Sequence, residues 1–406
     1  MKNLKLITCA MSIMPLFTVL HVNAKSPDLV ELNVPDIAIE KKAVHFSQRL
    51  SAKNLISFKA KGFTSISDEY WFEATGKQLK SGVALAISSP GALIRLSGKQ
   101  TKGKYSIPAK AIDPNSVQLF KNNKMLSSPF SQKVSQQEFA TANIFPNSSA
   151  MKLNSKLGKG EFTLKVDDYL VDEQRYIVNV KEKNAEHTLH LSLAKQSYMP
   201  GQKITFTSAL KSTSTNKKIL MQGKQKAYIK TPSGEKKTVS FTKYNDQFQF
   251  TLPTDLTSEK RGQLFELHVE TENRTNDLKV KRNAKVAFAI AQPTARIEIV
   301  GKLLNVASES GVRTKSDAAP SFADISLRVA SEGRYEISAV IYGSSGKNLS
   351  LPFMLSRSAY YLIPGDHTVK LRLDTDIIKS SGLKAPYAIK SVRLMDQSRM
   401  ALLQQM

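Results

Sequence analysis

Alternation of apolar and polar residues is the dominant pattern of the chain beyond residue 184. The stretch His187–Leu193 places Leu189, Leu191 and Leu193 on one face. Because successive side chains of a strand point to opposite faces of a sheet, this period of two predicts half-buried β-strands. The same alternation recurs at Lys203–Leu210, Leu264–Val269, Lys285–Ile290, Ile325–Val329, Tyr335–Ile341 and Val369–Leu373.

Turn residues separate these runs. The clearest are Pro200-Gly201, Pro232-Ser233-Gly234, Gly343–Gly346 and Pro364-Gly365. Short strands between such turns, without long helical patterns, predict antiparallel sandwiches. One short helix is expected near Asp376–Lys379, with Gly382 as its stop. The expected fold class is all-β, with tandem immunoglobulin-like sandwiches preceded by a β-rich N-terminal domain.

The first part of the chain is less regular. Strands are predicted at Leu55–Phe58, Val83–Ile87, Ala92–Leu96, Phe162–Val166 and Tyr176–Val180. The stretch Asn122–Ser149 is rich in Ser, Asn and Gln and is expected to be loop-rich, with a short helix near Ser135–Phe139.

We therefore expect four segments along the chain. They are a leader at 1–24, a β-rich N-terminal domain at 25–183, a sandwich at 184–297 and a C-terminal sandwich at 298–406. The run Arg296–Val300 beside the last boundary is itself strand-like, and it could end one domain or begin the next.

Residues 1–24 have the features of a secretory signal peptide. Lys2 and Lys5 precede an apolar stretch, and Val22-Asn23-Ala24 offers small residues at a cleavage site. Export to the periplasm, the cell surface or the medium is expected. The single Cys9 lies in this leader, so the exported chain would have no disulfide and no thiol nucleophile. No later apolar run approaches the roughly 20 residues of a membrane-spanning helix.

Positive charge is the main compositional signal. The chain has 59 Lys and Arg against 34 Asp and Glu, and residues 184–297 alone have 19 against 9. The candidate anion-binding residues there are Lys217, Lys218, Lys224, Lys226, Lys236 and Lys237. Solubility is the more ordinary explanation, and an anionic ligand such as lipopolysaccharide or an acidic glycan is the functional one. Lysine outnumbers arginine 45 to 14, which argues against specific nucleic-acid recognition.

Few residues have the spacing of a chemical site. Asp167, Asp168 and Asp172, beside Glu173, could begin a calcium site, although an EF-hand spacing and its glycine are missing. A solvated turn is the favoured alternative. Trp71 could belong to a carbohydrate-stacking platform, but a buried aromatic anchor of the N-terminal core is favoured. There is no Gly-x-Ser-x-Gly elbow or phosphate-binding glycine loop, and no cofactor is expected.

Three groups of motifs resemble DUF4785, an exported bacterial family of unknown function. They are Tyr70-Trp71-Phe72 with Ser89–Leu96, Ser197-Tyr198-Met199-Pro200-Gly201 with Arg282–Ala289 and Pro293–Arg296, and Gly333-Arg334-Tyr335-Glu336 with Leu394–Arg399. The resemblance covers nearly the whole chain after the leader. It implies an N-terminal β-rich domain, two immunoglobulin-like domains and no known activity. Phe265 stands where the family would have Trp, and we expect it to fill the same space.

These patterns favour a non-enzymatic binding or envelope-support protein that docks on an anionic surface component. The expected partner is that component or another protein. One alternative is a hydrolase, or a hydrolase accessory, whose site lies in the loop-rich segment 25–183. Another is a structural spacer without a binding site.

Overall fold

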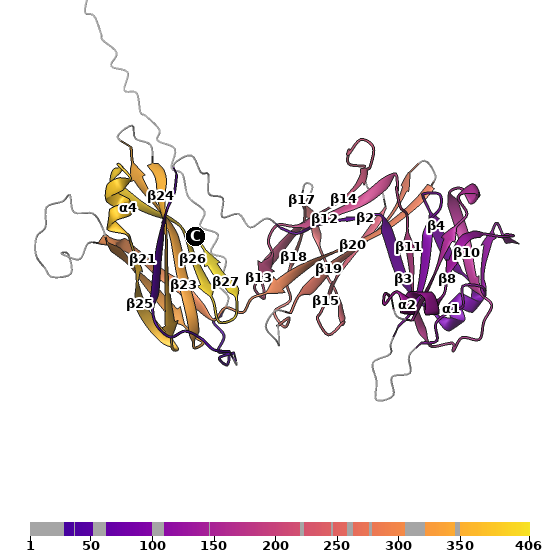
Figure 1. The fold of residues 1–406 in the computed structure, drawn as a ribbon, viewed down its shortest axis with the longest axis horizontal. Coiled ribbons are helices and arrows are strands. Elements are labelled where there is room, and N and C mark those ends of the chain that lie inside the picture. The colour runs from indigo at the N-terminus through magenta and orange to yellow at the C-terminus, as the bar shows by residue number, and fades with distance from the viewer. Residues whose placement is uncertain are drawn as a thin grey trace, which may run out of the picture.

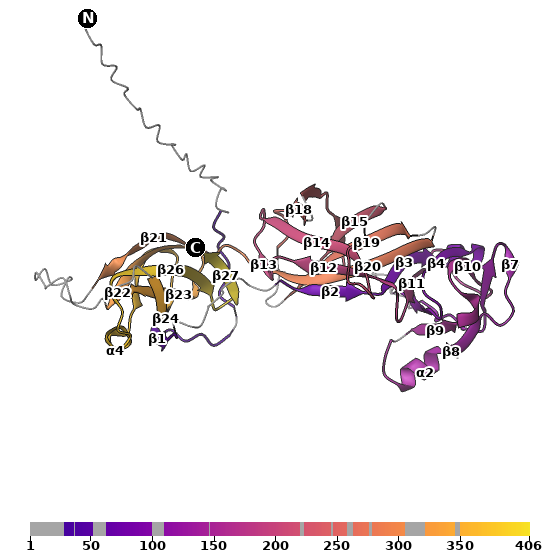
Figure 2. The same cartoon turned by 90° about the horizontal axis from the view of Figure 1, so that it is seen from above.

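The computed structural model describes residues 28–35, 37–51, 62–99, 109–145, 147–219, 223–244, 247–257, 263–275, 278–304, 321–345 and 350–406. The expected leader and the strand predicted at Leu55–Phe58 lie outside these residues. Three two-layered β units follow one another along the long axis of the molecule (Figures 1 and 2). We call them the N-terminal, middle and C-terminal sandwiches. The all-β fold class is confirmed.

The N-terminal sandwich packs a five-stranded sheet against a four-stranded one. The first sheet has the order β3-β11-β5-β9-β8, with β3 (Glu69–Thr75), β11 (Arg175–Lys181), β5 (Leu93–Gly98), β9 (Ser148–Leu153) and β8 (Phe130–Val134). The second has the order β4-β10-β6-β7, with β4 (Val83–Ile87), β10 (Gly160–Val166), β6 (Val117–Lys121) and β7 (Lys124–Met125). Their facing side chains form one core around Leu85, Leu96 and Tyr176.

Short helices occur at three places in this sandwich: α1 (Gly76–Ser81), the 3-10 turn η1 (Ser155–Leu157) and α2 (Gln136–Thr141). Helix α2 confirms the helix predicted near Ser135–Phe139. Both α helices begin with a capping box. The side chain of the capping residue, Thr75 or Ser135, accepts a hydrogen bond from the N–H of the third helical residue. The side chain of that third residue, Gln78 or Glu138, accepts a hydrogen bond from the N–H of the capping residue. Helix α1 was not predicted, because its six residues are too few for a helical period to appear.

The middle sandwich consists of two five-stranded sheets. One has the order β17-β18-β14-β12-β2, with β17 (Thr242–Tyr244), β18 (Gln247–Thr251), β14 (Lys203–Ser212), β12 (His187–Leu193) and β2 (Thr64–Ser67). The other has the order β13-β20-β19-β15-β16, with β13 (Ser197–Tyr198), β20 (Leu278–Ile290), β19 (Phe265–Thr275), β15 (Lys224–Lys230) and β16 (Lys236–Thr238). The predicted face of Leu189, Leu191 and Leu193 is buried, and Phe265 lies in the core as expected.

The C-terminal sandwich packs a five-stranded sheet against a three-stranded one. The larger sheet has the order β1-β24-β23-β26-β27, with β1 (Val44–Arg49), β24 (Ser350–Leu362), β23 (Gly333–Ser344), β26 (Lys384–Asp396) and β27 (Ala401–Gln405). The smaller one has the order β21-β22-β25, with β21 (Ala295–Leu304), β22 (Phe322–Val329) and β25 (Gly365–Arg372). Helix α4 (Thr375–Ser380) confirms the predicted short helix, and Gly382 after it has a positive φ of 70°.

The N-terminal residues do not stay in the N-terminal sandwich, where the sequence placed them. Strand β1 pairs along its whole length with β24 of the C-terminal sandwich, and β2 pairs with β12 of the middle one. Along the sequence, the chain first contributes β1 to the C-terminal sandwich and β2 to the middle one. It then forms the N-terminal sandwich, and afterwards it completes the middle and C-terminal sandwiches in turn. The domain boundary expected after residue 297 also falls inside β21, which begins at Ala295 and belongs to the C-terminal sandwich. The sequence left the second boundary open, since Arg296–Val300 reads as a strand, but the placement of β1 and β2 could not be seen in it because strand partners lie far apart along the chain.

Candidate functional site

The outer face of the sheet that contains β15 carries three of the six predicted lysines, Lys224, Lys226 and Lys236. Lys237 lies opposite the buried Ile229 in the register, so it points to the other face. Alternation along β15 turns Ala227 and Ile229 into the core, so Lys224 and Lys226 are exposed. In the strand register, Lys224 lies opposite Glu272 and Lys226 opposite Glu270. A column of acidic residues on β19 therefore runs beside the lysine column, and part of the positive charge of this face is compensated.

Ion pairs divide the predicted lysines into two groups. Lys236 Nζ lies 2.9 Å from Glu73 Oε1, and Lys237 Nζ lies 2.5 Å from Asp255 Oδ2. Glu272 is engaged by Lys279 at 3.1 Å and by Lys281 at 3.6 Å, on its side away from β15. Among the described residues, no ion pair forms at Lys217, Lys224 or Lys226. These three exposed ammonium groups are the ones available to an external anion.

The six lysines do not form one continuous cluster on a single sheet. Lys217 and Lys218 follow β14, and Lys218 forms a β-bridge with Lys211 at the end of that strand. They therefore belong to the opposite sheet of the middle sandwich from Lys224 and Lys236. Periodicity alone could not separate the two groups, because sheet membership depends on which strands pair.

Trp71 lies at the junction of the N-terminal and middle sandwiches. Its ring meets the edge of the His268 ring at 6.1 Å, and His268 stacks on Tyr228 at 4.7 Å. The Trp71 carbonyl accepts a 2.7 Å hydrogen bond from Asn283 Nδ2. Trp71 is only half-buried and stands outside the N-terminal core. The favoured expectation of a core anchor is therefore wrong, because the side chain is directed at the neighbouring sandwich instead.

Two titratable groups at this junction have shifted pKa values. Burial lowers the pKa of His268, although the nearby Glu266 carboxylate, 2.8 Å from its Nε2, opposes the shift. Burial alone would raise the pKa of Glu73, but hydrogen bonds from Lys99 and Lys236 lower it to about 2. His268 is therefore neutral and Glu73 ionised near neutral pH. These states suit a fixed contact between two domains.

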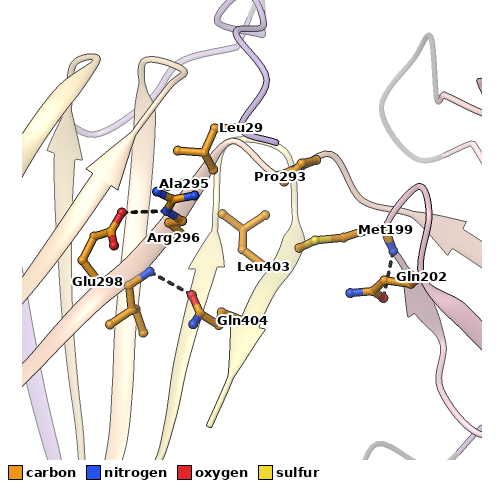
Figure 3. Close-up of a pocket in the computed structure, with 10 residues that line it drawn as sticks. Leu29, Met199, Gln202, Pro293, Ala295, Arg296, Glu298, Leu403 and Gln404 are labelled. Carbon is orange, nitrogen blue, oxygen red and sulfur yellow. Dashed lines mark hydrogen bonds and ion pairs between the residues drawn. The ribbon is translucent and has the colours of Figure 1, made fainter. Parts of the chain in front are cut away.

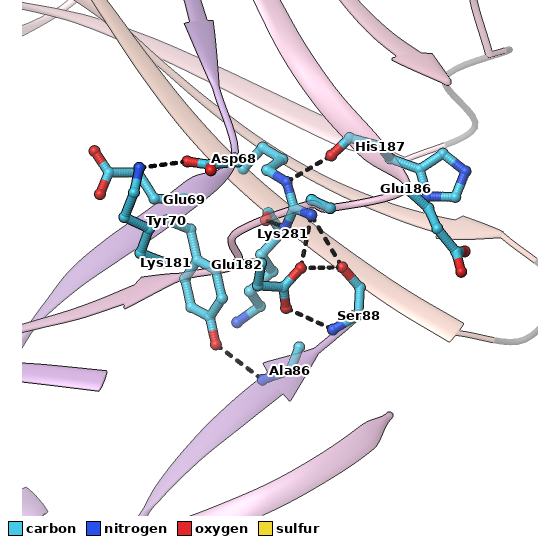
Figure 4. A network of polar contacts seen from close by, with 12 residues as sticks. Asp68, Glu69, Tyr70, Ala86, Ser88, Lys181, Glu182, Glu186, His187 and Lys281 are labelled. Carbon is cyan, nitrogen blue, oxygen red and sulfur yellow. Dashed lines mark hydrogen bonds and ion pairs between the residues drawn. The ribbon is translucent and has the colours of Figure 1, made fainter. Parts of the chain in front are cut away.

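A buried ionic network connects the same two sandwiches (Figure 4). Arg282 Nη2 of β20 lies 2.7 Å from Glu182 Oε2, and both side chains are fully buried. The Ser88 backbone N–H donates to Glu182 Oε1 at 2.6 Å, and Arg282 Nη2 donates to Ser88 Oγ at 3.0 Å. Arg282 Nε also donates to the His187 carbonyl at 2.9 Å. The guanidinium thus bonds to three segments of chain and fixes how they meet.

The acidic cluster proposed for calcium is dispersed. Lys80 Nζ lies 2.6 Å from an Asp172 oxygen, and Lys110 Nζ lies 3.1 Å from Asp168. Asp167 accepts instead from Gln118 Nε2 at 3.1 Å. Within the described part of the chain, no three His, Cys, Asp or Glu side chains converge as metal ligands. The described carboxylates therefore do not form the calcium grouping that the sequence left open, and their partners are lysine and amide groups instead.

A cavity of about 440 Å³ opens at the other junction, between the middle and C-terminal sandwiches (Figure 3). Its polar lining groups are largely engaged. Gln202 Oε1 accepts from the Met199 N–H at 3.1 Å, and Gln404 Oε1 accepts from the Ile297 N–H at 2.8 Å. Arg296 and Glu298 pair with each other at 2.6 Å. The remaining lining residues are Leu29, Pro293, Ala295 and Leu403.

The described lining of this cavity includes no Ser, Thr, Cys or His, and its one carboxylate, Glu298, is paired with Arg296. The sequence did not reveal it, since its walls come from four distant segments. Among the described helices, none is long and apolar enough to cross a membrane.

Comparisons with known proteins place the chain in a family. The model described as "Domain of unknown function (DUF4785) N-terminal domain" matches residues 35–182, and the corresponding C-terminal domain model matches 307–406. A crystal structure of a DUF4785 family protein from Legionella pneumophila aligns with a TM-score of 0.65 at 20% identity. The alignment covers 94% of this chain and 96% of that one, and the likeness concerns the fold. No curated protein matches the chain.

Proposed function

The chain belongs to the DUF4785 family, whose function is unknown, and from this premise we propose that it is an exported, non-enzymatic protein that binds an anionic component of the cell envelope. In this proposal the molecule acts as a support that holds its middle sandwich against a lipopolysaccharide, an acidic glycan or an anionic lipid surface.

The observation that carries the proposal is the charge arrangement of the middle sandwich. Two carboxylates of β19 are already bonded, Glu266 to Lys285 and Glu272 to Lys279 and Lys281, while the third, Glu270, lies opposite Lys226 in the register. Lys224 and Lys226 remain exposed on the neighbouring strand without an ion pair to a described carboxylate. With a net charge of +25, the surroundings would strengthen rather than cancel the attraction of an anion to them.

The elongated shape supports the same role. The three sandwiches lie in a row, and the junction of the first two is fixed by the buried Arg282–Glu182 pair (Figures 1 and 4). A long body with a fixed middle section can hold a docked surface at one orientation. The titratable side chains in the lining of the described cavity, Arg296 and Glu298, are bonded to each other, which favours a binding role over a catalytic one. The hydrolase and spacer alternatives have no specific observation in their favour.

The experiment is co-sedimentation of the full chain with anionic phospholipid vesicles, together with an acidic-glycan array, at two salt concentrations. Raising salt from about 0.1 M to about 1 M shortens the Debye length from roughly 10 Å to 3 Å, so we expect most binding to be lost. The informative variant is Lys224→Gln/Lys226→Gln, which removes two unpaired charges and should weaken binding several-fold.

A matched control is Lys236→Gln/Lys237→Gln. It removes the same total charge, but from ammonium groups that are already bonded to Glu73 and Asp255. We expect binding by this control to stay closer to that of the native chain. Equal weakening by both variants would reject docking at β15, and salt-independent binding, or none to any anionic probe, would reject the proposed function.

A further inference from the structure

Residues 28–35 and 37–51, here called the strap, lie extended along the C-terminal sandwich and are held through their backbone. The six residues of β1 pair with β24 in an unbroken antiparallel register from Val44↔Ala359 to Arg49↔Met354. Beyond β1, the Leu50 N–H donates to the Phe353 carbonyl at 2.8 Å. These bonds use only main-chain groups, which every residue except proline provides.

Before β1, side chains of the C-terminal sandwich grip backbone groups of the strap. Ser331 Oγ donates to the Val30 carbonyl at 2.6 Å and accepts from the Leu32 N–H at 2.9 Å. Arg399 Nη2 donates to the carbonyls of Leu32 and Asn33, at 3.2 and 2.9 Å.

A second arginine repeats this arrangement nearer to β1. Arg334 Nη1 donates to the carbonyls of Glu40 and Lys42, the latter at 2.9 Å. Ser331, Arg399 and Arg334 thus form a row of side chains that bond to the backbone of the strap and lead to the edge of β24. We call these three side chains the clamps.

The clamps are positioned by the C-terminal sandwich itself. Arg399 Nη1 is held 2.9 Å from Asp396 Oδ2, and the fully buried Asp396 accepts from Thr294 Oγ1 at 2.7 Å. Arg334 Nε donates to Gln397 Oε1 at 3.0 Å, and Ser331 is fully buried. The acceptor site therefore exists independently of which chain fills it, and leaving it empty would leave donors and a strand edge unpaired.

Polar strap side chains add contacts at the surface: His45 lies 3.1 Å from Ser358 Oγ and against the Tyr360 ring, Arg49 donates to Ser380, and Lys41 lies over the Tyr361 ring. The apolar strap side chains add little. Val34, Ile37, Val44 and Phe46 are 36%, 43%, 49% and 56% exposed, and none belongs to a core cluster. The strap can therefore leave the sandwich without opening a hydrophobic core. The next described strand after β1 is β2, which belongs to the middle sandwich.

From this geometry we infer that the C-terminal sandwich is a strand-acceptor site and that the strap of a second copy of the chain can occupy it. The second copy is the occupant because it carries the same backbone spacing, with carbonyls for Ser331, Arg399 and Arg334 and then a six-residue strand for β24. Exchange of an identical element costs little free energy, because each sandwich forms the same hydrogen bonds with either copy of the strap. This inference is independent of the proposed function.

The test uses two full-length chains in a Cys9→Ser background, each with one new cysteine. One carries Phe46→Cys and the other Arg357→Cys, at positions directly opposite in the β1–β24 register. Both native side chains are exposed, so neither substitution disturbs a core. The chains are unfolded separately, mixed, refolded together and oxidised. Strap exchange holds these two cysteines within disulfide distance, so a disulfide between the chains above the collision background reports that the strap of one chain lies on the sandwich of the other.

Disulfides that form by random collision are measured with a control mixture of Phe46→Cys and Asp366→Cys chains. Asp366 is an exposed position on β25 of the opposite sheet, where the strap does not lie. We expect the cross-linked dimer, counted on a non-reducing gel, to exceed this background several-fold and to increase with protein concentration. A single chain carrying both Phe46→Cys and Arg357→Cys should cross-link internally, which confirms the register. A mixed-chain yield no higher than the background would overturn the inference.

Discussion

At the residue scale, Arg282 is the most consequential side chain of the N-terminal–middle junction. Its partner Glu182 is equally buried, so removal of the guanidinium leaves a charge with no solvent and no counter-ion. We expect Arg282→Met to lower the free energy of unfolding by about 3–5 kcal/mol. Denaturant unfolding followed by the fluorescence of Trp71, the only Trp in the chain, measures this loss at the junction itself.

The comparison for this prediction is Arg328→Met. Arg328 also pairs with an acid, Asp366 at 2.9 Å, but both side chains are exposed, so we expect a much smaller loss of stability than for Arg282→Met. A double variant, Glu182→Leu/Arg282→Met, should recover much of the stability because no buried charge remains. If Arg282→Met cost no more than Arg328→Met, the network would not be holding the junction.

His268 gives the junction a dependence on pH. Burial lowers the pKa of His268 below 6.5 in the folded protein, so between that value and 6.5 the unfolded chain binds the proton more tightly. Stability is therefore highest above pH 6.5 and declines as pH falls below 6.5 through the lowered pKa of the folded protein. We expect His268→Gln to make the decline shallower, measured as the denaturant midpoint against pH. An unchanged slope would show that other groups, such as His45, His187 and His190, account for it.

At the element scale, the two capped helices respond differently to loss of the same motif. Helix α1 buries Leu79 in the N-terminal core, whereas α2 buries no residue completely. We expect Thr75→Ala to lower the free energy of unfolding by about 1 kcal/mol, because α1 unfolds only with its sandwich. Ser135→Ala should leave global unfolding unchanged, because α2 can fray alone. Denaturant curves decide this, and equal losses would contradict it.

Elements with a one-sided burial pattern were predictable from the sequence, and the others were not. Leu189, Leu191 and Leu193 alternate with polar residues, so β12 was visible as a strand. Strand β1 has exposed residues on both faces, including Val44 and Phe46, so no period marks it. Its partner β24 lies about three hundred residues away in sequence, and local patterns carry no information on such pairing.

The candidate sites also divide into features that local sequence patterns reveal and features that depend on distant parts of the chain. The richness of residues 184–297 in lysine could be counted, but the ion pairs that engage Lys236 and Lys237 involve acids from other strands. Trp71 was identified as notable, yet its neighbours His268 and Tyr228 belong to another sandwich. Composition therefore located the basic region, while only the fold could tell which lysines remain available.

At the scale of the whole molecule, the two junctions differ in what holds them. The first contains a buried ion pair, an aromatic contact and the Asn283–Trp71 hydrogen bond. The second contains a cavity, a short connection between β20 and β21, the Met199 side chain packed in the C-terminal core, and the Val30 N–H bonded to the Pro293 carbonyl at 2.9 Å. Because interfaces with few buried contacts permit domain motion, the second junction should be the hinge of the molecule.

Distance distributions between spin labels test this difference directly. In a Cys9→Ser background, exposed positions are Glu161 in the N-terminal sandwich, Lys243 in the middle one and Lys379 in the C-terminal one. We expect a narrow distribution for the 161–243 pair and a broader one for the 243–379 pair. Arg282→Met should broaden the first pair and leave the second unchanged, because it loosens only its own junction. Equal widths in the native chain would mean that the strap and the short connection hold the C-terminal sandwich as firmly as the ionic network holds the N-terminal one.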